Sequence, residues 1–331
     1  DKADQYIENH KHTIKKSHRH AFHAMAPIGW ANDPNGFSYF KGRYHLFYQH
    51  YPYKAEWGPM HWGHAVSDDL IGWKDLKVAL APDQPYDKGG CFSGTAFVEE
   101  DRLNILYTGH TDPEPGNPEA IRQVQCLAIS KDGITFEKHP KNPVIGTEEL
   151  PNHASIQDFR DPKLFKHEGT YYSVVGSRHT DGSGQLLMFE SVNMIDWHYH
   201  STLLRSHNEI GKMWECPDYI AFDEGDVFLV SPQFIEDEGH RFKNGHGSLN
   251  MVGDLDFENG RFQKRTIDEI DFGLDFYAPQ TLKTPDGRII MIAWMQMWDQ
   301  PMPTQKQGWA GSMTMPREIE LIDGVLYQYP V

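Results

Sequence analysis

The sequence contains very little cysteine. Its three cysteines, Cys91, Cys126 and Cys216, are far apart among 331 residues, and none forms a C-x-x-C pair. This spacing excludes a disulfide framework and a cysteine-based zinc site. A chain so poor in cysteine is typical of a reducing compartment, so we expect a cytoplasmic location.

Long apolar runs and excess positive charge are also missing. No stretch approaches the roughly 20 apolar residues of a membrane span, and the opening segment DKADQYIENHKHTIKKSHRH lacks the apolar centre of a signal peptide. The chain carries 31 Lys and Arg against 47 Asp and Glu, a net charge of −16. Because such a surface repels nucleic acid and anionic membranes, we predict neither as a partner. A small-molecule substrate is more compatible with this charge, and the oligomeric state is left open.

Signals for a bound metal or cofactor are absent as well. Five histidines lie among the first 23 residues, but they lack the spacing of metal ligands, and no glycine-rich phosphate loop occurs. We therefore predict no metal and no cofactor.

Aromatic residues, in contrast, are abundant at 13% of the chain, and many fall in a repeated unit. Each unit has a turn, an apolar position and an aliphatic or aromatic strand, and the units recur at roughly 60-residue intervals. The five copies are DPNGFSYFKGRYHLFYQ, SGTAFVEEDRLNILYTG, DPKLFKHEGTYYSVVGS, CPDYIAFDEGDVFLVSP and APQTLKTPDGRIIMIAW, anchored at Pro34, Gly94, Pro162, Pro217 and Pro279.

A second repeated segment predicts an outer hairpin in at least three units. It reads HAVSDDLIGW, LAISKDGITF and MFESVNMIDW, with a serine six residues before an aromatic ring. About four strands per unit and five units predict an all-β chain folded as a five-bladed β-propeller. An extended β-solenoid is the less favoured alternative. We expect residues 1–29 to form an N-terminal extension and residues 30–331 to form the propeller.

The residues just before the anchors are the candidate functional residues. The innermost strand of each blade begins near one mouth of the channel, so these positions should meet in space although they are distant in sequence. Aspartate and asparagine before proline or glycine are ordinary turn residues, but three carboxylates at matching places indicate a site, because clustered like charges cost stability. The convergent pairs are Asn32-Asp33, Phe92-Ser93, Arg160-Asp161, Glu215-Cys216 and Tyr277-Ala278.

One carboxylate is offset from the other two. Asp33 and Asp161 directly precede their anchors, whereas Glu215 stands two residues before its anchor. We expect either a bulge in the fourth blade or a different approach of Glu215 to the site, and a different chemical role in both cases. Two carboxylates on either side of a glycosidic bond are the minimum equipment of a glycosidase.

Four motifs carry a resemblance to a known family. WANDPNG, FSGT, FRDPK and WECPD resemble the block motifs of glycoside hydrolase family 32, the β-fructofuranosidases, which include invertases and sucrose-6-phosphate hydrolases. The resemblance extends from about Trp30 to the segment GWAGSMTMPRE, and the family is known for a five-bladed propeller. Family members usually carry a C-terminal β-sandwich as well. The sequence stops at LYQYPV, so we expect that sandwich to be absent or truncated.

The resemblance implies roles for individual residues. It makes Asp33 the nucleophile, Glu215 the general acid/base and Asp161 the acid that holds sugar hydroxyls, in a retaining hydrolysis of terminal β-D-fructofuranosides. We also expect Arg160 to keep Asp33 and Asp161 ionised. The residues that the resemblance places around the fructosyl unit are Asn32, Gln49, Trp57, Phe92, Ser93, Arg160, Tyr277 and Trp294.

Two other functions and the exact substrate stay open at this point. The alternatives are a propeller that binds fructans without catalysis and a related five-bladed glycosidase acting on arabinan or xylan. Sucrose, sucrose 6-phosphate and short fructooligosaccharides are all compatible with the motifs. A phosphate on the leaving sugar would need cations at the rim of the site, for which the candidates are Lys54, Arg178 and Lys212.

Overall fold

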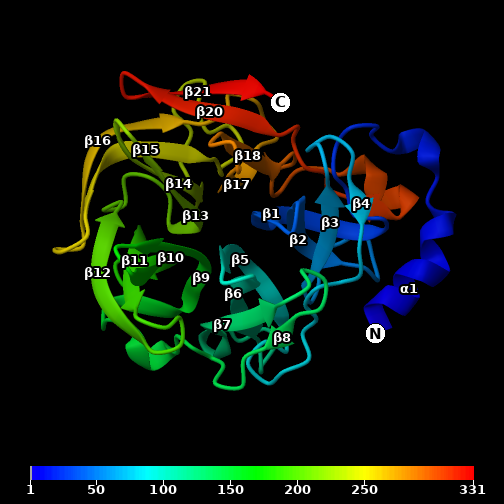
Figure 1. Cartoon of the computed structure of the whole chain (residues 1–331), viewed down its shortest axis with the longest axis horizontal. Helices are drawn as coiled ribbons and strands as arrows, with labels where there is room; N and C mark the ends of the chain where they lie inside the picture. The colour runs from blue at the N-terminus through cyan, green and yellow to red at the C-terminus, as the bar shows by residue number, and fades with distance from the viewer. Residues whose placement is uncertain (1) are drawn as a thin grey trace.

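Five β-sheets surround a central channel in the computed structural model, which describes residues 2–331 (Figure 1). The sheets follow one another around the ring in chain order, from blue to red in the figure. The five-bladed propeller predicted from the repeats is therefore confirmed.

Each blade contains four strands that follow one another outward from the channel in sequence order. In the fifth blade the short strand β19, which lies between β18 and β20 in the sequence, is not part of the sheet. Blade 1 has β1 (Gly29–Phe40), β2 (Arg43–Tyr51), β3 (His61–Ser67) and β4 (Lys74–Asp75), and blade 2 has β5 (Gly90–Glu99), β6 (Arg102–Thr111), β7 (Arg122–Ser130) and β8 (Glu137–Lys138). Blade 3 has β9 (Ala154–His167), β10 (Thr170–His179), β11 (Gly184–Ser191) and β12 (Trp197–Arg205). Blade 4 has β13 (Met213–Phe222), β14 (Gly225–Gln233), β15 (Leu249–Asp256) and β16 (Arg261–Glu269), and blade 5 has β17 (Tyr277–Lys283), β18 (Ile289–Trp294), β20 (Arg317–Ile322) and β21 (Val325–Pro330).

The ring closes through the segment between β18 and β20. In this segment β19 (Trp309–Ala310) leaves blade 5 and pairs in parallel with the start of β1, Gly29 opposite Trp309 and Trp30 opposite Ala310. Blade 1 thus gains a fifth strand from the other end of the chain. This pairing joins the start of blade 1 to the segment that connects two strands of blade 5, and so ties the first and last blades together.

The hydrophobic core is divided among the contacts between neighbouring blades. Five clusters of buried apolar side chains lie between blades 1 and 2, 2 and 3, 3 and 4, 4 and 5, and 5 and 1. Each blade therefore buries both of its faces against other blades, and this explains the near-continuous burial of second strands such as β10 and β14. A sixth cluster, which includes Trp30, Cys216 and Trp294, lies beneath the mouth of the channel.

The first 28 residues contain the one α-helix of the described chain, α1 (Lys2–His10), which the sequence analysis did not predict. Figure 1 places α1 beside blade 1. Asp4 accepts a hydrogen bond from the backbone of Val78 at 2.8 Å, and Tyr6 donates one to the carbonyl of Tyr53 at 3.2 Å.

Short 3₁₀ turns occur at Lys11–Thr13, Lys16–His18, Pro118–Ala120, Thr147–Glu149 and Pro303–Gln307. Among residues 2–331 no helix is long and apolar enough to cross a membrane.

The predicted outer hairpins are also confirmed, and one side-chain motif stabilises all three. Ser67 and Asp69 between β3 and β4 accept bonds from the backbone of residues 70–72, and Ser130 with Asp132 does the same between β7 and β8. The third copy uses Asn193 in place of the aspartate. These side chains satisfy backbone donors that the turn leaves free.

A bulge interrupts every inner strand at its anchor. The pairing shifts between Ala31 and Pro34 in β1, and equivalent shifts occur in β5, β9, β13 and β17. In the last three blades the residue before the proline has a positive φ: Asp161 at 66°, Cys216 at 47° and Ala278 at 53°. The bulge foreseen for the fourth blade alone is thus a feature of all five, and the strained backbone marks the place where side chains are directed into the channel.

Candidate active site

A cavity of about 410 Å³ opens at the channel mouth, where the bulges of the first four blades meet. Nine of the eleven residues predicted from the sequence line it. They come from blades 1 to 4: Asn32, Asp33, Gln49, Trp57, Phe92, Ser93, Arg160, Asp161 and Glu215.

Asp33 lies at the floor of this cavity and is 7% exposed. Its Oδ2 accepts a hydrogen bond from the Ser93 hydroxyl at 2.6 Å and lies 3.4 Å from the Cys216 thiol. Its Oδ1 is buried and has no hydrogen-bond partner within residues 2–331. Burial, and then the charge of Glu215, raises the pKa of Asp33. The site therefore holds a desolvated carboxylate with one oxygen free to react.

Asp161 lies next to Asp33 and is held by the neighbouring blade. Its Oδ2 accepts a bond from the Cys216 backbone N–H at 3.0 Å, and its own N–H donates to the Thr108 hydroxyl at 2.9 Å. Burial, and then the charge of Glu215, raises the pKa of Asp161 towards neutrality, although Arg160 opposes the shift. Cys216 bridges the two aspartates, since its thiol also lies 3.5 Å from Asp161 Oδ2.

Glu215 is held by the equivalent residues of the two neighbouring blades. Arg160 Nε donates to Oε1 at 2.9 Å, and the Tyr277 hydroxyl donates to Oε2 at 2.6 Å. The same hydroxyl lies 3.0 Å from the Ser231 carbonyl. Burial, and then Glu215, raises the pKa of Tyr277 well above its usual value, so the phenol stays protonated and serves as a donor. The offset of Glu215 along its strand thus puts it in line with Arg160 and Tyr277.

The expected role of Arg160 is corrected by this geometry. We expected its charge to keep Asp33 and Asp161 ionised. Its guanidinium instead bonds Glu215 and Asp158 (Nη1 to Oδ1 at 2.8 Å). Burial, and then the charge of Glu215, raises the pKa of both aspartates, and Arg160 opposes this shift at Asp161 alone.

Two predicted residues lie outside the cavity lining. Tyr277 is buried and reaches the site through its hydroxyl on Glu215. Trp294 is also fully buried, and packs against Trp298 and Trp30 with ring centroids 4.9 and 6.1 Å away. Trp298, which the sequence analysis missed, is the tryptophan of this group that lines the cavity.

The sequence analysis missed eight lining residues, because none of them stands at the two positions before an anchor that repeat from blade to blade. Asp158 alone had a usable signal, since it stands two residues before Arg160 in QDFRDPK. Gln123 and Gln233 accept further bonds from the Arg160 guanidinium at 3.3 Å each. The eight are His110, Asp112, Ile121, Gln123, Gln157, Asp158, Gln233 and Trp298.

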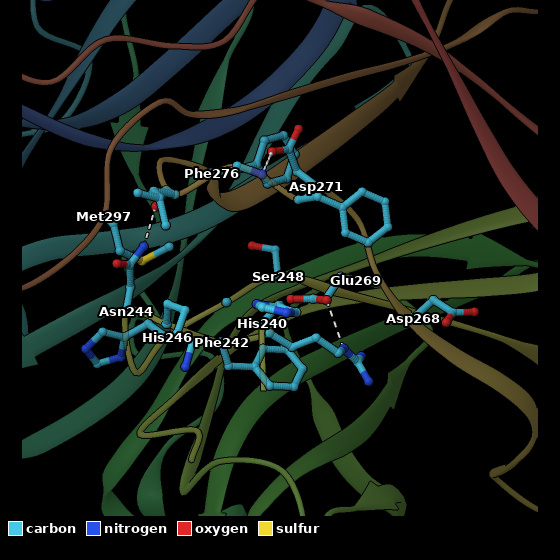
Figure 2. A pocket seen from close by; sticks show the side chains of 16 residues that line it. His240, Phe242, Asn244, His246, Ser248, Asp268, Glu269, Asp271, Phe276 and Met297 are labelled. Carbon is cyan, nitrogen blue, oxygen red and sulfur yellow. Dashed lines mark hydrogen bonds and ion pairs between the residues drawn. The ribbon is translucent and has the colours of Figure 1, made fainter. Parts of the chain in front are cut away.

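A second cavity of about 490 Å³ lies on the same face of the propeller, between the β14–β15 and β16–β17 loops (Figure 2). Figure 2 shows His240, Phe242 and Asn244 on one side and Asp271 and Phe276 on the other. None of the three predicted catalytic acids lines it. Most of its charged groups are already paired, Arg241 with Glu269 at 2.9 Å and Lys243 with Asp237 at 2.7 Å for example, so the first cavity is the stronger candidate for the active site.

Ligands for a metal are not clustered in the structure. No group of three or more His, Cys, Asp or Glu side chains within residues 2–331 is arranged to hold a metal ion. The three cysteines are free and buried.

The fold and this cavity together define a class of protein: a five-bladed propeller with paired carboxylates at the channel mouth, which is the equipment of a glycosidase. The chain belongs to the family described as Glycosyl hydrolases family 32, whose N-terminal domain matches residues 23–330.

Relatives with known names agree with this assignment. The chain is 44% identical to the raffinose invertase of Escherichia coli and 43% identical to a sucrose-6-phosphate hydrolase of the same organism, in each case over 94% of this chain and 64% of the relative. It thus spans somewhat less than two thirds of the length of these relatives. Among solved structures, the β-fructofuranosidase of Bombyx mori, a mutant in complex with sucrose, has a TM-score of 0.92 at 40% identity, covering 100% of this chain and 69% of that one. A sucrose-6-phosphate hydrolase from Lactobacillus gasseri has a TM-score of 0.90 at 32% identity, covering 99% and 67%.

Proposed function

We propose that the chain hydrolyses terminal non-reducing β-D-fructofuranosides with retention of anomeric configuration. The observation that carries this proposal is that Asp33 and Glu215 line one cavity and differ in the hydrogen bonds that their carboxyl groups accept. Asp33 is desolvated and keeps one oxygen unbonded, as a nucleophile requires, whereas both oxygens of Glu215 are oriented by hydrogen bonds, as proton transfer requires.

In the first step Asp33 attacks the anomeric carbon of the fructosyl unit while Glu215 gives its proton to the departing glycosidic oxygen. The carbon–oxygen bond to the leaving sugar breaks, and a fructosyl ester forms on Asp33. In the second step a water molecule attacks the same carbon, Glu215 takes the proton of that water, and the ester bond to Asp33 breaks. Fructose leaves and both carboxyl groups return to their starting states.

The other residues at the floor bind and orient the sugar in this proposal. Asp161 accepts hydrogen bonds from fructosyl hydroxyls, and Asn32 and Gln49 contribute amide groups from the same buried wall. Trp57, half exposed, and Phe92 line the entrance and offer ring faces to the apolar side of the sugar. Ser93 holds the Asp33 carboxylate through its hydroxyl.

The family assignment and the names of the relatives support fructosides over arabinan or xylan. No observation favours a propeller that only binds fructans, since such a module gains nothing from burying two carboxylates beside a third. The cytoplasm stays our proposed location, based on the scarcity of cysteine.

The test is fructose release from sucrose, 1-kestose and inulin, with 4-nitrophenyl α-L-arabinofuranoside as the competing substrate. We expect release from sucrose and 1-kestose, and none from the Asp33→Asn variant. Activity on the arabinofuranoside alone would overturn the proposal. If the unmodified chain released fructose from none of these substrates although circular dichroism showed it to be folded, the proposal would also be contradicted.

A further inference from the structure

The catalytic cavity has a deep part and an outer part with different charges. Asn32, Asp33, Gln49, Ser93 and Asp161 are all at least 93% buried and form the deep part. In the proposed function the fructosyl unit is bound there. The leaving sugar then lies beyond Glu215, in the outer part of the cavity.

Carboxylates and amides contribute most of the polar side chains of this outer part. Asp112, Asp158, Gln157 and Gln233 line it, and Asp112 is an exposed side chain whose carboxylate forms no ion pair within the described chain. Counting both parts, five carboxylates face the cavity and one guanidinium, that of Arg160, faces them.

Arg160 has little capacity left to bind an anion. It is 11% exposed, and its N–H groups already bond Glu215, Asp158, Gln123 and Gln233. His110 adds no charge at neutral pH, because burial and then Arg160 lower its pKa to about 4.

The three cations considered for phosphate binding lie outside the lining of this cavity. Lys54 is paired with Glu56 at 3.1 Å. Arg178 lies 3.7 Å from Asp158, so part of its charge is already neutralised by a carboxylate that faces the cavity. Lys212 is exposed just before β13 and does not reach the lining.

A phosphate group needs charge-assisted hydrogen bonds from cations, and at neutral pH it carries a charge between −1.5 and −2. In the outer part it would instead face Asp112 and Asp158, within a chain of net charge −16. We propose that this site selects fructosides with an uncharged leaving group and rejects sucrose 6-phosphate, although several relatives are named sucrose-6-phosphate hydrolases. This inference rests on the proposed function and names its substrate class.

Three substrates that differ at a single position of the leaving glucose separate charge from size. Sucrose has a free hydroxyl at C6, raffinose has an uncharged galactosyl unit there, and sucrose 6-phosphate has the phosphate. We expect kcat/KM for sucrose 6-phosphate to be at least about tenfold below that for sucrose, with raffinose between them. Raising the ionic strength from about 0.02 to 0.5 M should bring kcat/KM for sucrose 6-phosphate closer to that for sucrose, because salt screens exposed charges. The ratio of kcat/KM for raffinose over sucrose should not change.

Asp112→Asn is the diagnostic variant, and Asp68→Asn, on the outer turn of blade 1, is the matched control. Asp112→Asn should raise the ratio of kcat/KM for sucrose 6-phosphate over sucrose several-fold, whereas Asp68→Asn should leave it unchanged. Equal or better cleavage of sucrose 6-phosphate by the unmodified chain would overturn the inference. A kcat/KM for raffinose as low as that for sucrose 6-phosphate would also overturn it. So would a fall in kcat/KM for sucrose 6-phosphate alone in the Arg178→Gln variant. If no fructoside is cleaved at all, the proposed function itself fails, and that result is distinct from each of these.

Discussion

Cys216 and Asp33, 183 residues apart in the sequence, meet in the catalytic cavity with Sγ 3.4 Å from Oδ2. The thiol is buried, and burial followed by the charges of Asp161 and Asp33 raises its pKa well above the ordinary value. Cys216 therefore stays a neutral thiol that donates weakly to the carboxylates. It does not form the thiolate that nucleophilic catalysis would need.

This contact leads to the first prediction. Cys216→Ala removes one weak hydrogen bond worth about 1 kcal/mol, so kcat should fall by about tenfold or less while KM changes little. Iodoacetamide should not label the folded chain. Cys126→Ala, a buried cysteine outside the cavity, is the control. Complete inactivation by Cys216→Ala, or rapid alkylation at neutral pH, would show that the thiol has a chemical role.

The second prediction concerns the two proposed chemical groups and the hydroxyl that orients one of them. Glu215→Gln should lower kcat roughly 10²- to 10⁴-fold, because it removes proton transfer. Tyr277→Phe should lower kcat roughly 10- to 100-fold, because it removes one hydrogen bond to a charged group. Tyr219→Phe deletes a similar hydroxyl–carboxylate bond, to Asp226 at 2.7 Å, near the β13–β14 turn and outside the cavity lining, and should have no effect on kcat. If kcat fell equally in the two tyrosine variants, the effect would come from a general change in the folded structure and not from the lost hydrogen bond to Glu215.

Retention of configuration is the third prediction. A covalent fructosyl intermediate on Asp33 gives β-fructofuranose first, and an added alcohol should capture the same intermediate to give a fructoside. Nuclear magnetic resonance spectra recorded within the first minutes of hydrolysis distinguish the anomers before they equilibrate. Initial release of the α anomer would exclude the double displacement.

The fourth prediction is a stability difference that depends on pH. The pKa of Asp161 is raised in the folded chain, so folding favours its protonated form, and this contribution to stability is lost as pH rises above the ordinary carboxyl range towards neutrality. Asp161→Asn carries no charge at any pH. Its Tm should therefore exceed that of the unmodified chain at pH 8, and the difference should shrink towards pH 4, while activity falls.

Asp132 provides the control, because its pKa is lowered in the folded chain whereas that of Asp161 is raised. Backbone N–H groups of Thr135 and Ile134 lower its pKa to about 2, so its ionised form favours folding at neutral pH. Asp132→Asn should not raise Tm at pH 8, and the turn itself tolerates asparagine, as Asn193 shows in blade 3. A Tm of Asp161→Asn below that of the unmodified chain at pH 8 would contradict the fourth prediction.

Local sequence determined the fold and the floor of the site. Each unit encodes its own turn and inner strand, so the repeat revealed five blades, and the residues before Pro34, Pro162 and Pro217 had to meet because inner strands start at one mouth of the channel. The same local rules could not show the bulge in every blade, since a register shift depends on how a strand pairs with its neighbour.

Tertiary structure alone decided what surrounds those acids. Asp112 follows β6, Gln157 lies in β9 ahead of the repeated positions, and Gln233 ends β14, and only the packing of the blades brings them to one cavity. It also decided that Trp294 is buried beneath Trp298, and that Arg160 bonds Glu215 and not the two aspartates. These outcomes depend on distances between side chains from different blades, and such distances are set by the closure of the ring and not by any one segment of the sequence.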